Sequence, residues 1–196
     1  MLAGTTTGTD ARNVHGQAIA VTVFSTVRWW GRLWLPLVFL GSRLFPRSQA
    51  RLAELSFIHF ARWTLVRRLP YNGPPQPRHR LRYAHLLFES NFNGGWEEYI
   101  DAFSWILTRD MRTAWGSSYG FPDPLPATPF KAYIRRNAVD ASHFYSAYPE
   151  ATTTMALAGL ELTGKLDAFA RRAGGMAPEA FATAWREFLT DAQRCL

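Results

Sequence analysis

Four residues on predicted strands have side chains suited to acid–base or ligating chemistry: His59, Glu89, His143 and Tyr145. A carboxylate beside an imidazole orients the ring, so that the imidazole can act as a general base or bind a haem iron. Glu89 is the most informative of the four. It directly follows three large apolar residues (86–88), so its carboxylate must be paired, solvated or protonated.

The alternation of side chains along a strand predicts which of these residues share a face. His59 lies on the same face of its strand as Trp63, whereas Arg62 points to the other face. Since this strand and the strand that carries Glu89 are neighbours in the predicted sheet, we expect His59 and Glu89 to meet across it. Such a pair is equally compatible with a structural, buried role, as is a lone His143 on an apolar strand.

Candidate substrate-binding side chains surround this predicted pair. Trp63, Tyr83 and Asn91 come from the same two strands, and Asn93 follows in the turn NFNGG. The two asparagines also suit the left-handed backbone of a turn beside Gly-Gly, which is their alternative role.

The pattern of apolar residues predicts an α+β fold with the element order β-α-β-β-α-β and extra C-terminal helices. The arrangement is the ferredoxin-like one, with an antiparallel sheet and both crossover helices on one face. Residues 1–17 are expected to form a disordered arm, and 18–196 a single domain. The predicted strands are 18–27, 57–66, 81–91 and 140–148. The predicted helices are 29–55, as one helix or as a pair interrupted at Pro46, and 96–115, 151–174 and 178–195, with 130–137 a short helix or strand.

On the segments SFIHFARW and LLFESNFNGGWEEYIDAF, the chain resembles the dimeric α+β barrel superfamily, in particular uncharacterised bacterial proteins and peroxidase-associated domains of this type. The resemblance covers about residues 18–149 and implies a cavity on the sheet face and a homodimer. The superfamily includes haem peroxidases and small monooxygenases. Their Gly-x-x-Asp-Gly haem motif is replaced here by NFNGG, so the resemblance carries over the fold and the cavity position only.

Composition sets limits on the class of protein. An apolar fraction of 47% and a charged fraction of 19% in 196 residues exclude wholesale disorder. Eight Trp, seven Tyr and fourteen Phe indicate either an aromatic-lined cavity or a bulky core. The single cysteine, Cys195, excludes an intrachain disulfide and fits a cytoplasmic location. The net charge is +7, but no nucleic-acid-binding motif accompanies the arginines, so nucleic acid is not expected as a partner.

The apolar segment 18–45 could either be buried in the protein or contact a membrane. Arg28 and Arg32 interrupt it and leave uncharged runs of about ten residues, against the roughly 18–20 needed to span a bilayer. The segment therefore predicts a buried strand followed by a packed helix. The alternative is a peripheral amphipathic helix that contacts the membrane through the aromatic patch Trp29–Trp34.

Two functions remain open. In the first, the protein is an oxidoreductase of peroxidase or monooxygenase type that acts on a hydrophobic small molecule in an aromatic cavity, with haem or with no cofactor. In the second, it is a non-catalytic binding or membrane-peripheral protein whose contact surface is the Trp/Arg-rich N-terminal segment. A closed cavity with converging polar groups would favour the first function, and an exposed Trp29–Trp34 patch would favour the second.

Overall fold

The computed structural model of the chain describes residues 11–45 and 55–195. It forms two compact units, residues 1–150 and residues 151–196, where the sequence predicts a single domain over 18–196. Within the predicted disordered arm, residues 1–10 lie outside the described residues. The arm's remaining residues include a 3₁₀ turn, η1 (Ala11–Asn13), and a short strand, β1 (Val14–His15).

The first unit is built on a four-stranded antiparallel sheet with the strand order β1-β2-β4-β3. The long strands are β2 (Ala18–Val27), β3 (Ile58–Arg68) and β4 (Arg80–Phe92), which confirms the three predicted strands in this part of the chain. Among its described residues, the helices of the unit are α1 (Gly31–Leu44), α3 (Trp96–Ile106), α4 (Thr108–Trp115) and α5 (Ala127–Asn137). The segment predicted as helix or strand at 130–137 is thus helical.

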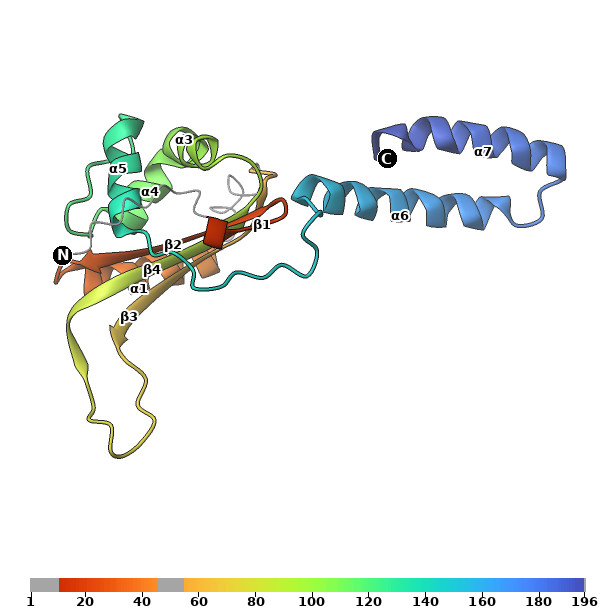
Figure 1. Ribbon diagram of the computed structural model, residues 1–196. Coiled ribbons are helices and arrows are strands. Elements are labelled where there is room, and N and C mark those ends of the chain that lie inside the picture. Colours follow the sequence, from red (N-terminus) through yellow and green to blue (C-terminus); the bar gives the residue numbers. More distant parts are fainter. Residues whose placement is uncertain (1–10, 46–54, 196) are drawn as a thin grey trace. The chain divides into compact units, whose positions relative to one another are not determined.

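The core lies on one face of the sheet, under α3, α4 and α5 (Figure 1). Alternate residues of β4, such as Leu86 and Phe88, are buried on this face, because successive side chains of a strand point to opposite sides. The ring of Phe88 lies 4.9 Å from that of Trp63 and 5.0 Å from that of Trp115, centroid to centroid. The aromatic residues here pack against one another, which is the arrangement of a bulky core.

The predicted fourth strand over 140–148 is wrong. Residues 141–149 contain no strand, and β1 occupies the edge of β2 where a fourth strand would pair. The segment instead runs beside η1 and β1 and is held by side chains. Asn13 Nδ2 donates to Asp140 Oδ1 at 2.9 Å, and the Ser146 amide donates to His15 Nδ1 at 2.8 Å. The alternation of aromatic and small residues in 140–148 therefore does not correspond to a β-strand paired in the sheet.

The predicted helix 96–115 divides at Leu107, which is fully buried and has non-helical backbone angles. The hydroxyl of Thr108 donates to the carbonyls of Ser104 and Trp105, and such local bonds compete with the regular helix pattern. The predicted helix 29–55 ends at Leu44 as α1, and its residues 46–54 lie outside the described residues.

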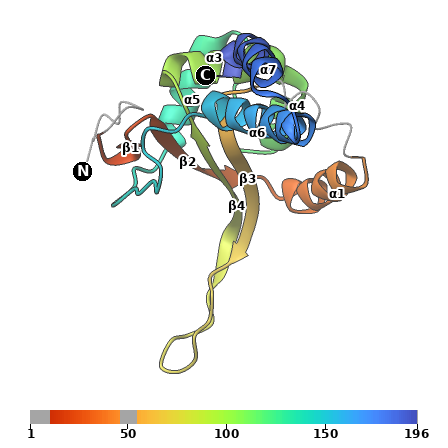
Figure 2. The same ribbon diagram turned by 90° about the vertical axis from the view of Figure 1, so that its right-hand side faces the viewer.

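Helix α1 touches the core with only one of its faces. Gly31 and Leu35 are its buried residues, and Trp34 Nε1 donates to the carbonyl of Thr113 in α4 at 3.2 Å. Figure 2 shows α1 at the side of the first unit, and the end of the β3–β4 hairpin projecting away from the rest of that unit.

The second unit is a pair of helices, α6 (Thr153–Ala173) and α7 (Pro178–Ala192), followed by a 3₁₀ turn, η3 (Gln193–Cys195). The helices confirm the two predicted near the C-terminus. Phe169 and Phe188 form the buried centre of the pair, and their rings lie 5.1 Å apart. Lys165 links α6 to α7 through an ion pair with Asp191 at 3.1 Å.

The close approach of α1 to the core predicts a different response at its two glycines. A Cβ atom at Gly31 would lie 2.5 Å from Ser117 Oγ and 2.5 Å from Val27 Cγ1, so Gly31→Ala should lower the free energy of unfolding by about 1–3 kcal/mol. Gly41 has open space, so Gly41→Ala should raise it by about 0.5–1 kcal/mol. Urea unfolding of both variants checks this, and equal effects would contradict the described packing of α1.

Candidate functional site

The carboxylate of Glu89 is paired with an arginine. Glu89 lies directly opposite Arg62 on the neighbouring strand β3, and Arg62 donates to Glu89 Oε2 through Nε at 3.0 Å and through Nη2. Both side chains lie on the face of the sheet opposite the core. The predicted pair of His59 with Glu89 is therefore wrong, and the partner is the residue that alternation had assigned to the other face.

The register of β3 against β4 is the reason for this difference. The register between β3 and β4 shifts between Ile58 and Phe60, which pair with Phe92 and Asn91. His59 is the extra residue at this point and is exposed. Arg62 pairs with Glu89 and Trp63 with Phe88, so Glu89 lies on the face of Arg62 and not on the face of Trp63. The alternation within β3 is as predicted, but the register that decides which face of β3 adjoins Glu89 is not a local property of the sequence.

The other two predicted catalytic residues lie elsewhere. His143 and Tyr145 belong to the irregular segment at the β1 edge, and both are exposed. The Tyr145 ring packs at 5.7 Å from the ring of His15. The structure thus does not bring His59, Glu89, His143 and Tyr145 together.

The predicted substrate-binding residues are also dispersed. Trp63 packs in the core, and Tyr83 packs edge-on against Tyr119 with ring centroids 6.0 Å apart. Asn91 lies on the opposite face, in register with Phe60, and Asn93 Nδ2 donates to the carbonyl of Gln17 at 2.8 Å. Asn93 therefore joins the turn after β4 to the turn between β1 and β2. Neither asparagine has the left-handed backbone of the alternative prediction, which Gly94 adopts in this turn with φ of 94°.

Within residues 11–45 and 55–195, no group of three or more His, Cys, Asp or Glu side chains is placed to hold a metal ion. In the same part of the chain, no helix has both the length and the apolar character needed to cross a membrane.

The most unusual surface of the first unit is the outer face of α1. Four leucines, spaced by four, three and four residues, form one stripe along the helix on the side opposite the buried Gly31 and Leu35. They are strongly exposed: Leu33 by 70%, Leu37 by 63%, Leu40 by 52% and Leu44 by 64%. Trp29, just before the helix, is 76% exposed. Soluble proteins rarely leave so many neighbouring apolar side chains uncovered, so this stripe indicates a contact surface.

Arginines gather in the same part of the chain. Residues 18–88 contain eleven arginines, no lysine and a single carboxylate, Glu54, although the whole chain is only +7. Arg62 is ion-paired with Glu89. In the described residues, none of Arg28, Arg32, Arg43, Arg67, Arg68, Arg78, Arg80 and Arg82 forms an ion pair with a carboxylate. The basic residues of α4 and α5, by contrast, include several with acidic partners, such as Arg112 with Asp123 at 2.9 Å.

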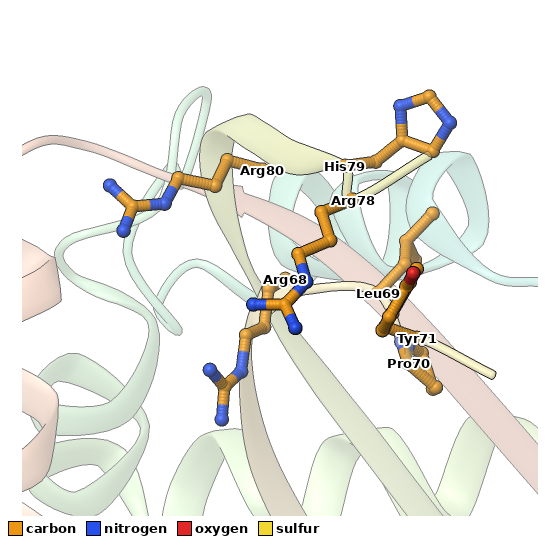
Figure 3. A pocket seen from close by; sticks show the side chains of 7 residues that line it. All are labelled: Arg68, Leu69, Pro70, Tyr71, Arg78, His79 and Arg80. Carbon is orange, nitrogen blue, oxygen red and sulfur yellow. The ribbon is translucent and has the colours of Figure 1, made fainter. Parts of the chain in front are cut away.

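Two hollows lie among these arginines, and Arg68 and Arg80 line both. The first, of about 290 Å³, is also lined by Arg32, Arg67 and Leu81, so that it joins the start of α1 to the base of the β3–β4 hairpin. The second, of about 580 Å³, lies toward the hairpin loop. There Arg68, Arg78 and Arg80 extend to one side of the hairpin while His79 points away (Figure 3). The guanidinium of Arg78 stacks over the Tyr71 ring, 4.8 Å from its centroid.

The arginines of α1 and those of the hairpin that line the two hollows lie more than 20 residues apart in the sequence, so no local motif connects them. The available signal was the near absence of carboxylates between residues 18 and 88, combined with the 4-3-4 spacing of leucines in α1.

Comparison of the chain with models of known families, with curated proteins and with solved structures gives no match. The resemblance to the dimeric α+β barrel superfamily therefore stays a prediction from the sequence.

The position of Glu89 predicts a small energetic role. The side chains of Arg62 and Glu89 are 64% and 29% exposed, so their attraction is weakened by water. We expect Glu89→Gln and Arg62→Gln each to change the free energy of unfolding by less than about 1 kcal/mol, with a coupling of similar size in the double variant. A loss above about 3 kcal/mol in urea unfolding would show instead that the carboxylate is buried and needs this partner.

His85, on the same face of the sheet, predicts a dependence of stability on pH. Its ring stacks on Phe24 at 4.6 Å, and burial lowers its pKa from the ordinary value. Below about pH 6.5 the unfolded chain therefore binds more protons at this residue, so its contribution to stability is lost as the pH falls below that value. His85→Gln should reduce the rise in unfolding free energy between pH 5 and 7. An NMR titration that placed the His85 ring at or above its ordinary pKa would contradict this.

Proposed function

We propose that this protein is a non-catalytic, peripheral membrane-binding protein that attaches to anionic lipid surfaces through α1 and the arginines beside it. The observation that carries the proposal is the exposed leucine stripe of α1, formed by Leu33, Leu37, Leu40 and Leu44, next to arginines that have no acidic partner among the described residues.

The leucine stripe has the properties of a helix that lies in the plane of a membrane surface. Such helices place leucine and aromatic side chains about 5–10 Å into the boundary between headgroups and acyl chains, with arginine on the flanks. Arg32 and Arg43 lie on one flank of the stripe by helical position. Trp29, at the start of the helix, suits the headgroup level, where tryptophan is enriched.

The arginines supply the second half of the attraction. Each basic side chain near an anionic bilayer contributes about 1 kcal/mol at physiological ionic strength, and the contribution falls as salt is added. A single short apolar helix binds membranes weakly, so the combination of insertion and charge is what makes attachment stable. A cytoplasmic location with peripheral membrane contact is part of this proposal.

Charge also argues against the other occupants of the α1 face. A second copy of the chain, docked about a two-fold axis at this face, would bring two sets of unpaired arginines close together, at an electrostatic cost. A nucleic acid would match the arginines but offers nothing to the leucines, which would stay exposed to water.

The enzyme alternative has less support from the geometry, since its predicted catalytic residues do not meet and the charge of Glu89 is balanced by Arg62.

We also propose that the first unit is related to the ferredoxin-like fold. This relation is supported by the adjacency of β2, β4 and β3, while a homodimer through the outer sheet face is supported by the partial exposure of Phe24, Phe60 and Tyr83 there.

The test is a vesicle co-sedimentation assay with a double variant in the stripe. Leu37→Glu with Leu40→Glu removes two apolar side chains that would insert, each worth roughly 1.5 kcal/mol or more, so binding to phosphatidylserine-containing vesicles should fall by about 100-fold or more. The matched control is Leu157→Glu with Leu160→Glu in α6, which has the same spacing and comparable exposure.

The proposal requires that wild type binds anionic vesicles, that binding weakens with salt, and that only the α1 variant loses it. Equal losses in both variants, or no vesicle binding by the wild type, would overturn the proposal. Arginine-dependent binding to single-stranded RNA, with vesicles ignored, would replace it with a nucleic-acid function.

A further inference from the structure

We infer that the hollow between α1 and the base of the β3–β4 hairpin is a binding site for a phosphate monoester, presented at the membrane by the headgroup of an anionic phospholipid such as phosphatidic acid. This inference rests on the proposed membrane function for the source of the phosphate and names the lipid group that the protein would select.

The hollow collects guanidinium groups from three separate segments. Arg32 comes from the first turn of α1, Arg67 and Arg68 from the end of β3, and Arg80 from the start of β4. Its volume of about 290 Å³ is several times the roughly 30 Å³ that one water molecule occupies, so a phosphate group and part of a glycerol fit inside it.

The arrangement of these arginines brings like charges together and would favour a bound anion. Arg68 and Arg80 are direct partners in the β3–β4 ladder, and like charges opposite one another on a sheet are unfavourable. Arg67 is fixed by donation from its Nη2 to the carbonyl of Arg32 at 3.0 Å, which ties the hairpin to α1. In the described residues no carboxylate is ion-paired with any of the four, so an external anion would relieve their mutual repulsion.

The chemistry of the groups favours phosphate. A guanidinium presents planar, forked N–H donors that match phosphate oxygens in a bidentate way, whereas an ammonium acts as a point charge. A phosphate monoester carries up to two negative charges and offers three terminal oxygens, enough for more than one arginine at once. The carboxylate of phosphatidylserine offers two oxygens and one charge.

The place of the hollow in the fold fits a headgroup. Arg32 immediately precedes Leu33, the first leucine of the exposed stripe. When the leucines lie among the acyl chains, a hollow at the start of the same helix lies at the level of the phosphates. The second hollow shares Arg68 and Arg80 and adds Arg78, so it extends the positive surface toward the hairpin loop (Figure 3).

The experiment compares vesicles that contain phosphatidic acid with vesicles that contain phosphatidylserine, at mole fractions adjusted to equal surface charge. Wild type should bind the phosphatidic acid vesicles about tenfold more tightly, the ratio expected for one additional charge-assisted hydrogen bond. Arg68→Gln with Arg80→Gln should abolish this preference. The matched control, Arg109→Gln with Arg136→Gln, removes the same charge from exposed positions of α4 and α5 and should keep the preference.

A second pair of variants separates forked recognition from charge. Arg68→Lys with Arg80→Lys retains the net charge, so binding to phosphatidylserine vesicles should stay near that of the wild type while the preference for phosphatidic acid is lost. Retention of the full preference by the lysine variant would overturn the assignment of a guanidinium site.

The failures of the two proposals give different results. Equal binding of wild type to both kinds of vesicle would overturn the phosphate site and leave the membrane function standing. No binding to either vesicle would overturn the membrane function. In that event, an NMR titration with glycerol 3-phosphate decides on the hollow: shifts in the wild type that Arg68→Gln with Arg80→Gln removes would support a site for a free phosphate ester, and their absence would overturn the site.

Discussion

The pairing of β4 with both β2 and β3 is the constraint on which the first unit depends. Because β4 lies between them from Ala84 to Phe92, its alternate residues there are committed to a buried face and an open face. The buried face, with Leu86 and Phe88, receives the helices α3, α4 and α5. The open face carries Glu89 and His85, so these polar residues are placed outside the core by the same pairing that builds it.

The same topology leaves α1 at the margin. Strands β2 and β3 are both antiparallel to β4 and therefore parallel to one another, and parallel strands need a connection that returns along the sheet. Helix α1 provides part of this return and reaches the core with one face, through the buried Gly31 and Leu35 and the partly buried Phe39. Because α1 is apolar on nearly all sides but buried on one side only, its leucine face is exposed to solvent. In the proposed membrane function, this face would instead contact lipid.

The helical layer over the core and the α1–hairpin region also differ in how their charged side chains are paired. In the helical layer over the core, Lys131 is shared between Glu97 and Asp101, and these contacts raise the pKa of Lys131 while the same lysine lowers that of Glu97. On α1 and the hairpin, the described arginines have no such partners apart from Arg62. Several basic side chains of the helical layer are thus paired within the unit, whereas the arginines of α1 and the hairpin are, in our proposal, the groups that attract an external anion beside the leucine stripe.

The three long strands and the two C-terminal helices could be predicted from the sequence, since their apolar patterns are local. The division of 96–115 at Leu107 and the helical state of 130–137 could not. The remaining features depend on contacts between distant parts of the chain. The register of β3 against β4 places Arg62, and not His59, opposite Glu89. The short strand β1 took the edge of β2 from the segment 140–148. The burial of α1 on one face only, and the meeting of Arg32 with Arg68 and Arg80, depend on contacts between residues far apart in the chain, which no local pattern records.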